Sequence, residues 1–134
     1  MTTRFADAFF YIALLDSTDQ HHRRVLAHAE SVREMRVTTR WVLAEVADAL
    51  SAPQLRQAAL RLLERVEADP DTIIAGPSDT LFQSGVSLFA QRPDKHWSLT
   101  DCISFAVMHD HGFTEALTGD HHFAQAGFTA IFAV

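Results

Sequence analysis

Short apolar blocks alternate along this chain with segments in which apolar residues recur every three or four positions. The blocks predict short buried strands, and the spacing of three or four is typical of helices with one buried face. Strands are expected at Arg4–Ala8, Arg36–Thr38, Thr72–Ala75 and Glu115–Thr118. Helices are expected at Phe9–Leu15, His21–Arg33, Arg40–Leu50 and Gln54–Ala68, from the Gly76–Ser78 turn towards Gln91, and from Ser98 to Gly112. This alternation predicts an α/β fold in which a mostly parallel central sheet carries helices on both faces.

Polar residues at the expected helix ends support these boundaries. Thr39 can accept a hydrogen bond from the free first-turn amides of the helix that begins at Arg40. Ser98 and Asp101 have the spacing of a capping box, in which each side chain bonds the backbone amide of the other residue. Gly112 is suited to end the same helix in a left-handed conformation. No linker, repeat or low-complexity segment interrupts the series, so residues 1–134 are expected to form one domain.

Composition narrows the setting in which this domain works. The single cysteine, Cys102, lies in an apolar stretch, which indicates a core residue in a reducing compartment. The longest apolar run, Ala8 to Leu15, is too short to span a bilayer, so we expect a soluble cytoplasmic protein with no membrane partner. The net charge of −6 argues against nucleic-acid binding through a general basic field. A nucleic-acid ligand would need metal and local arginines, for which the candidates are Arg23, Arg24, Arg40 and Arg92.

Asp7 and Asp120 each lie at the end of an expected strand. Asp7 interrupts an apolar segment, where an ionised carboxylate is costly unless its charge is compensated. Asp120 follows a strand across Gly119, and ligands in open parallel sheets bind outside the carboxyl ends of the strands. Capping of a strand-to-helix turn is the alternative role. Their positions predict that both acids lie at one rim of the sheet.

Glu45 and Asp101 lie on expected helices that begin near the same rim. Glu45 falls at the border of the apolar face of its helix, where an acid is ordinarily just solvated. Asp101 has Phe105 and Met108 as neighbours on the helix surface, and its first-turn position lets the helix dipole stabilise its charge. Four carboxylates at one rim would repel one another unless a cation lay among them. Mg²⁺ or Mn²⁺, which prefer oxygen ligands, fit that need.

Histidines leave a zinc site or a metal-independent histidine mechanism open as alternatives. The chain has eight, including the pairs His21–His22 and His121–His122. Adjacent side chains on a helix or strand are expected to point apart, and no CxxC or HExxH motif is present, which disfavours zinc. His122 is the histidine that we expect closest to the acidic rim.

Four motifs follow one another along nearly the whole chain. They are Phe-Ala-Asp-Ala-Phe-Phe-Tyr-Ile-Ala-Leu-Leu from Phe5, Thr-Thr-Arg-Trp-Val-Leu-Ala-Glu from Thr38, Trp-Ser-Leu-Thr-Asp-Cys from Trp97 and Leu-Thr-Gly-Asp-His-His-Phe from Leu117. Together they resemble the PIN-domain nucleases, and among these the VapC-type toxins of toxin–antitoxin pairs. The resemblance implies that Asp7, Glu45, Asp101 and Asp120 are catalytic metal ligands. Thr118 is expected to support the site by hydrogen bonding to Asp120 or to water at the metal.

The same resemblance implies an activity and partners. We expect a Mg²⁺- or Mn²⁺-dependent ribonuclease that leaves 5′-phosphate ends, acts as a toxin, and has RNA, a cognate antitoxin and a second copy of itself as partners. A stand-alone RNA-processing PIN nuclease and a Mg²⁺-binding receiver-type signalling domain are the alternatives. A receiver domain would need paired acids after the first strand and a lysine after a late strand. Asp7 has no acidic neighbour, and the only lysine, Lys95, precedes a helix.

Overall fold

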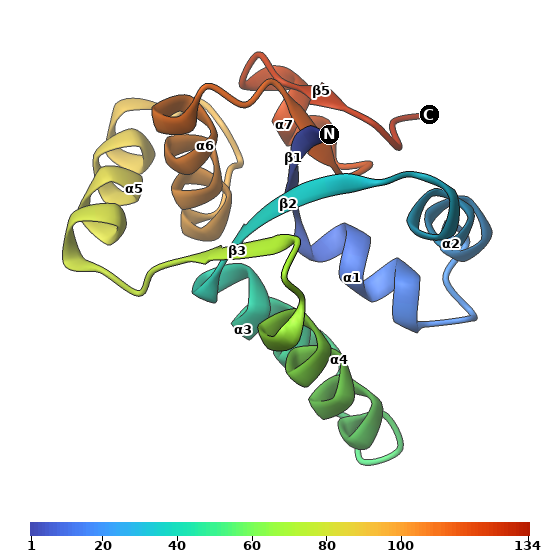
Figure 1. Cartoon of the computed structure of the whole chain (residues 1–134). Coiled ribbons are helices and arrows are strands. Elements are labelled where there is room, and N and C mark those ends of the chain that lie inside the picture. The colour runs from blue at the N-terminus through green and yellow to red at the C-terminus, as the bar shows by residue number, and fades with distance from the viewer.

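In the computed structural model of residues 1–134, five strands form one parallel sheet in the order β3-β2-β1-β4-β5 (Figure 1). The strands are β1 (Thr2–Ala6), β2 (Glu34–Thr39), β3 (Thr72–Ala75), β4 (Glu115–Leu117) and β5 (Thr129–Ala130). In the centre of the sheet, Phe5 of β1 is in register with Val37 of β2 on one side and with Ala116 of β4 on the other. The expected parallel sheet is confirmed, and it contains no antiparallel pair.

Seven helices cover this sheet. They are α1 (Ala8–Leu15), α2 (His22–Ser31), α3 (Arg40–Ala49), α4 (Arg56–Ala68), α5 (Asp79–Gln91), α6 (Leu99–His111) and α7 (His121–Gln125). Figure 1 shows α1 to α4 on one side of the sheet and α5 and α6 on the other. Right-handed crossovers explain this division, because the chain moves from β1 to β3 in one direction and then returns past β1 to β4 in the other. The expected helices on both faces are therefore present.

Several boundaries differ from those that the sequence suggested. The first strand ends at Ala6, before Asp7, because Asp7 has the extended conformation of an N-cap residue and starts α1. Strand β2 begins two residues earlier than expected, at Glu34. The Glu34 side chain is buried and forms an ion pair with Arg4 of β1. The sequence also gave no indication of α7 and β5, since five and two residues are too few for a periodic pattern.

The capping predictions are confirmed in detail. The Thr39 hydroxyl accepts a hydrogen bond from the Val42 amide at 3.1 Å. Ser98 and Asp101 form the complete capping box at the start of α6. Gly112 ends that helix with φ of 72°, in the left-handed region. Helix α6 therefore begins and ends at fixed points, which fixes the position of Asp101 in its first turn.

The core lies on both faces of the sheet and contains no disulfide. Its fully buried side chains include Phe5, Phe10, Ile103, Met108 and Phe123, and Cys102 is buried beside them as a free thiol. Helix α1 is apolar around its whole circumference because it packs against α2 and α3 as well as the sheet. None of the seven helices combines the length and apolar character needed to cross a bilayer.

A buried ion cluster lies at the amino end of β2, at the opposite edge of the sheet from the carboxyl ends of the strands. The Glu34 carboxylate is fully buried and accepts hydrogen bonds from Arg4 Nη1 at 2.8 Å and Arg36 Nε at 3.1 Å. His28 Nε2 lies 3.0 Å from the same carboxylate. Burial alone would raise the pKa of Glu34, but its partners outweigh that effect and lower it. This compensated acid has a structural role, in contrast to the acids at the other edge.

Candidate active site

The acidic residues predicted from the sequence gather where the strand order reverses. Strand β1 is followed by Asp7, and its neighbour β4 is followed by Thr118 and Asp120. The helices leaving β1 and entering β4 lie on opposite faces of the sheet (Figure 1). Such a topological switch point is where open α/β sheets bind ligands. The fold therefore places Asp7 and Asp120 side by side, as the sequence indicated.

Thr118 joins the two strand ends. Its buried hydroxyl donates a hydrogen bond to Asp7 Oδ2 at 2.8 Å and accepts one from the Asp120 backbone amide at 3.0 Å. The sequence suggested that this hydroxyl bonds Asp120 or water at the metal, and a bond to Asp120 is present, through its backbone amide. The hydrogen bond that orients the Asp7 carboxylate was not predicted. A valine at this position would leave both groups without this partner.

Asp7 is the most deeply placed of the four acids. Its side chain is 6% exposed, and burial raises its pKa to about 7. The Thr118 hydrogen bond lowers the pKa, whereas the charges of Asp101 and Glu45 raise it further. A carboxyl group with this pKa is about half protonated at neutral pH unless a positive charge is nearby. Burying the ionised Asp7 carboxylate is thus unfavourable by itself, and a bound cation would remove this penalty.

Asp101 reaches the same site from the first turn of α6. Its Oδ2 atom accepts a hydrogen bond from the Ser98 amide at 3.2 Å, which is the capping role. Burial raises the pKa of Asp101 in spite of that bond, and the charge of Asp120 adds to the effect. A residue that served only as a cap would be stabilised as an anion by the helix terminus. Asp101 is therefore both a cap and a member of a repelling acidic cluster.

Glu45 extends into the site from the second turn of α3, and it is the exposed member. Its pKa is raised by partial burial of its carboxyl group and by the charges of Asp101 and Asp120. No protein group in the site donates a hydrogen bond to it. The structure thus brings all four predicted acids within electrostatic range of one another, with three of them linked to a hydrogen-bonding partner and Glu45 open to solvent.

His122 lies between two of these acids. Its Nδ1 atom is 3.2 Å from Asp101 Oδ2 and 3.4 Å from Asp120 Oδ1, and its backbone amide donates to Asp120 Oδ1 at 2.9 Å. The sequence had placed His122 nearest to the rim, and this is confirmed. The expectation that adjacent histidines point apart is wrong for this pair, because the first residues of the short helix α7 direct both rings towards Asp120. Asp120, His121 and His122 hold their donor atoms within 4.8 Å of one another.

The donor set at this rim fits a divalent cation. Carboxylate oxygens predominate, their charges repel one another, and Asp7 and Asp101 have raised pKa values for that reason and because they are buried. A hard cation that takes several oxygen ligands removes both penalties at once. Asp7, Asp101 and Asp120 could supply such oxygen ligands, although the three donor groups that already lie within 4.8 Å of one another are those of Asp120, His121 and His122.

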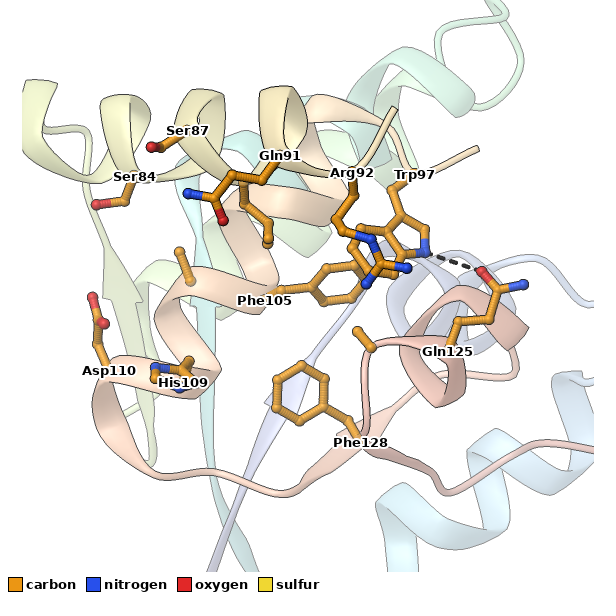
Figure 2. Close-up of a pocket in the computed structure, with 13 residues that line it drawn as sticks. Ser84, Ser87, Gln91, Arg92, Trp97, Phe105, His109, Asp110, Gln125 and Phe128 are labelled. Carbon is orange, nitrogen blue, oxygen red and sulfur yellow. Dashed lines mark hydrogen bonds between the residues drawn. The ribbon is translucent and has the colours of Figure 1, made fainter. Parts of the chain in front are cut away.

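A separate cavity, lined by none of the four acids, lies elsewhere in the protein (Figure 2). It has a volume of about 510 Å³ between α5, α6 and the segment after α7, and its walls include Arg92, Trp97 and Phe105. Figure 2 shows the Trp97 indole N–H directed at the Gln125 side chain, to which it donates a hydrogen bond of 3.0 Å. The acidic centre is the better candidate for chemistry, because it contains the buried titratable groups and the cavity does not.

Among the four arginines considered for binding nucleic acid, three already have partners within the protein. Arg40 pairs with Glu67, and Arg92 pairs with Asp94. Arg24 donates to the Phe132 carbonyl oxygen at 3.2 Å. The Arg92 guanidinium also lies over the Trp97 ring, 5.3 Å from its centroid.

The family model of the PIN domain matches residues 5–129. This chain therefore belongs to the PIN domain family, and its fold is that of a PIN-domain nuclease, a class of phosphodiester hydrolases that generally use a divalent metal. Family membership overturns the receiver-domain alternative, which needed a phosphate-accepting acid and a lysine that this fold does not provide.

Among solved structures, the chain is similar to VapC20 of Mycobacterium tuberculosis, a toxin that cleaves the sarcin–ricin loop. The TM-score is 0.87 at 22% sequence identity, over 97% of this chain and 98% of VapC20. This likeness shows a shared fold over the whole length. No curated protein sequence matches the chain significantly.

Proposed function

We propose that this protein is a Mg²⁺- or Mn²⁺-dependent endoribonuclease whose catalytic metal ligands are Asp7, Glu45, Asp101 and Asp120. The observation that carries the proposal is the convergence of these carboxylates, three of them with raised pKa values, at the switch point of a PIN fold. Uncompensated acids in such a place destabilise a protein, and their presence is explained if they bind a cation.

Each residue has a distinct task in this proposal. Asp7, Asp101 and Asp120 would hold the metal, which when bound would lower the pKa of a coordinated water and neutralise charge on the phosphate. Thr118 and His122 keep the carboxylates of Asp7, Asp101 and Asp120 in one orientation through hydrogen bonds. Glu45, which faces solvent, would bind the same ion through a water molecule.

Metal removal tests this function. A 5′-labelled single-stranded RNA should be cleaved in about 5 mM Mg²⁺ or Mn²⁺ and should remain intact in excess EDTA. Products should carry 5′-phosphate and 3′-hydroxyl ends, because water attacks the phosphorus and the RNA 2′-hydroxyl takes no part. Cleavage that persists in EDTA with cyclic phosphate ends would instead assign the chemistry to the histidines. Restoration by Zn²⁺ alone would favour the Asp120, His121 and His122 cluster as the metal site.

We further propose that the protein is the toxin of a toxin–antitoxin pair, held inactive in the cytoplasm by a cognate antitoxin. The similarity to VapC20, itself a toxin, supports this role over that of a stand-alone RNA-processing nuclease. Such a pairing is encoded by neighbouring genes, so a small reading frame immediately upstream would favour it. The RNA target of VapC20 belongs to that protein and is one candidate substrate to assay.

We propose a homodimer that forms through the face of α5 that carries Phe82 and Phe89. These side chains lie two turns apart and are 36% and 51% exposed, although Phe82 also lies 6.3 Å from the Trp41 ring of the same chain, and exposed apolar side chains that lie close together can mark a surface that a partner covers. Phe89→Glu should therefore shift the protein from dimer to monomer in sedimentation-velocity experiments, with an unchanged far-UV spectrum. Leu60→Glu on α4 is the matched control, since Leu60 is equally exposed at 52% but lies outside this face. A wild type that sediments as a monomer at micromolar concentration would contradict the proposal.

A further inference from the structure

A second polar cleft adjoins the acidic centre. It has a volume of about 320 Å³ and is lined by Asp94, Lys95, His96, His121, His122 and Gln125. His122 belongs to both sites, because its ring contacts Asp101 and Asp120 on one side and lines the cleft on the other. A polymer that is bound at the acidic centre and extends past His122 must therefore pass over these residues.

The cleft contains a cationic side chain in a protein of net charge −6. Lys95 is the only lysine of the chain, and its ammonium forms no ion pair. The one acid in the cleft, Asp94, is already paired with Arg92 through Nη2–Oδ2 and Nε–Oδ1 contacts of 2.9 and 3.0 Å. The free charge in the cleft is therefore that of Lys95, and the imidazole and amide groups around it supply hydrogen-bond donors.

The loop that presents Lys95 is held in place on both sides. The Lys95 amide donates to the Arg92 carbonyl oxygen at 3.1 Å, and the Arg92 guanidinium lies over the Trp97 ring. Trp97 in turn donates to Gln125 Oε1, as the dashed line in Figure 2 shows. Because the Gln125 side-chain oxygen accepts this bond, the Gln125 side-chain nitrogen remains available as a donor in the wall of the cleft. These bonds fix the backbone that presents Lys95 and the side chain of Gln125.

We infer that this cleft binds the RNA backbone phosphates next to the scissile bond, with Lys95 as the principal cation. The inference rests on the proposed ribonuclease function and adds which side of the acidic centre binds the RNA. A phosphodiester chain is repelled by the carboxylates that a bound metal leaves uncompensated, so a cation in the cleft that shares His122 with the acidic centre favours binding there. None of the residues that line the cleft is hydrophobic, which suits a sugar–phosphate chain better than the apolar side chains of a protein partner.

Lys95→Ala tests the inference on the full-length protein with Mg²⁺ and a single-stranded RNA of about ten nucleotides. We expect KM to rise roughly tenfold with a much smaller change in kcat, because the lost contact binds substrate and transition state alike. The slope of log KM against log salt should become shallower by about 0.7, the value for one phosphate contact on a single strand. Lys95→Arg should restore both quantities. Arg61→Ala on α4, which removes an exposed cation far from the cleft, should behave as wild type.

The outcomes separate this inference from the function on which it rests. Wild-type cleavage together with an unchanged KM and salt slope in Lys95→Ala would overturn the cleft assignment and leave the nuclease proposal intact. Unchanged RNA kinetics with weaker binding of polyglutamate would overturn it in favour of an acidic protein segment. A loss of kcat at constant KM would show that Lys95 acts on the reacting phosphate and not on its neighbours. No metal-dependent cleavage by wild type would overturn the proposed function itself.

Discussion

Asp101→Asn is expected to reduce metal-dependent RNA cleavage by more than the roughly 10–100-fold that loss of an outer-shell metal partner costs. The substitution keeps the shape of the side chain and a carbonyl oxygen that can still accept from the Ser98 amide, so the capping box survives in part. It removes one of the negative charges that would hold the metal. Initial rates at saturating RNA over a Mg²⁺ titration measure both the loss of activity and the weaker affinity for metal.

The stability of the same variant distinguishes a metal ligand from a simple cap. Because burial and Asp120 raise the pKa of Asp101, its charge is unfavourable in the metal-free fold, and Asp101→Asn should melt at the same temperature or higher in EDTA. Added Mg²⁺ should then raise the melting temperature of wild type more than that of the variant, because a bound ligand stabilises only the state that binds it.

Asp79→Asn is the matched control for this experiment. Asp79 also lies in the first turn of a helix, α5, but it is exposed and belongs to no acidic cluster. Its loss should cost about 0.3–1 kcal/mol of helix-dipole stabilisation and leave cleavage unchanged. If Asp101→Asn behaves in the same way, with full activity and an equal Mg²⁺-induced shift, Asp101 is only a helix cap.

Asp7→Asn is expected to abolish a large pH dependence of stability in the metal-free protein. The pKa of Asp7 is about 7 in the folded state and near 3.8 in the unfolded chain, so the folded state binds more protons between these values. Stability contributed by this group is therefore present in acid and is lost as the pH rises from about 4 to about 7. A pKa difference of this size between the folded and unfolded states corresponds to a loss of roughly 4 kcal/mol of unfolding free energy at neutral pH and above. Asparagine has no charge to bury and can still accept the Thr118 hydrogen bond.

Urea unfolding in EDTA at several values between about pH 4.5 and about pH 8, a range that covers most of the interval between the unfolded and folded pKa values of Asp7, measures this effect. The difference in unfolding free energy between Asp7→Asn and wild type should grow with pH in favour of the variant. Asp110→Asn, an exposed acid at the end of α6, should follow wild type at every pH. Saturating Mg²⁺ should reverse the order of stability at pH 8. Parallel pH profiles for Asp7→Asn and wild type would show that the carboxylate is not buried as described.

Local sequence signals were enough to predict most elements and the identity of the candidate acids. Thr39, Ser98 and Gly112 determine helix ends through bonds and conformations that involve only neighbouring residues, and these ends are where the sequence placed them. Strand β3 occupies the expected residues Thr72–Ala75 for a similar reason, since an apolar segment lies between clear turn residues. Asp7 and Asp101 stood out because each is an acid in an apolar setting.

The tertiary structure decided which groups meet, because such contacts join residues that are far apart in the chain. Thr118 bonds Asp7 across 111 positions, and Arg4 and Glu34 pair across 30. Helix α7 and strand β5 are too short to form by themselves, and they are stabilised by packing of the buried Phe123 and by pairing with β4. The sequence thus determined the elements and the acids, whose signals are local. The fold determined the acidic centre and the Lys95 cleft, because proximity and desolvation arise only when the parallel strands place distant chain segments side by side.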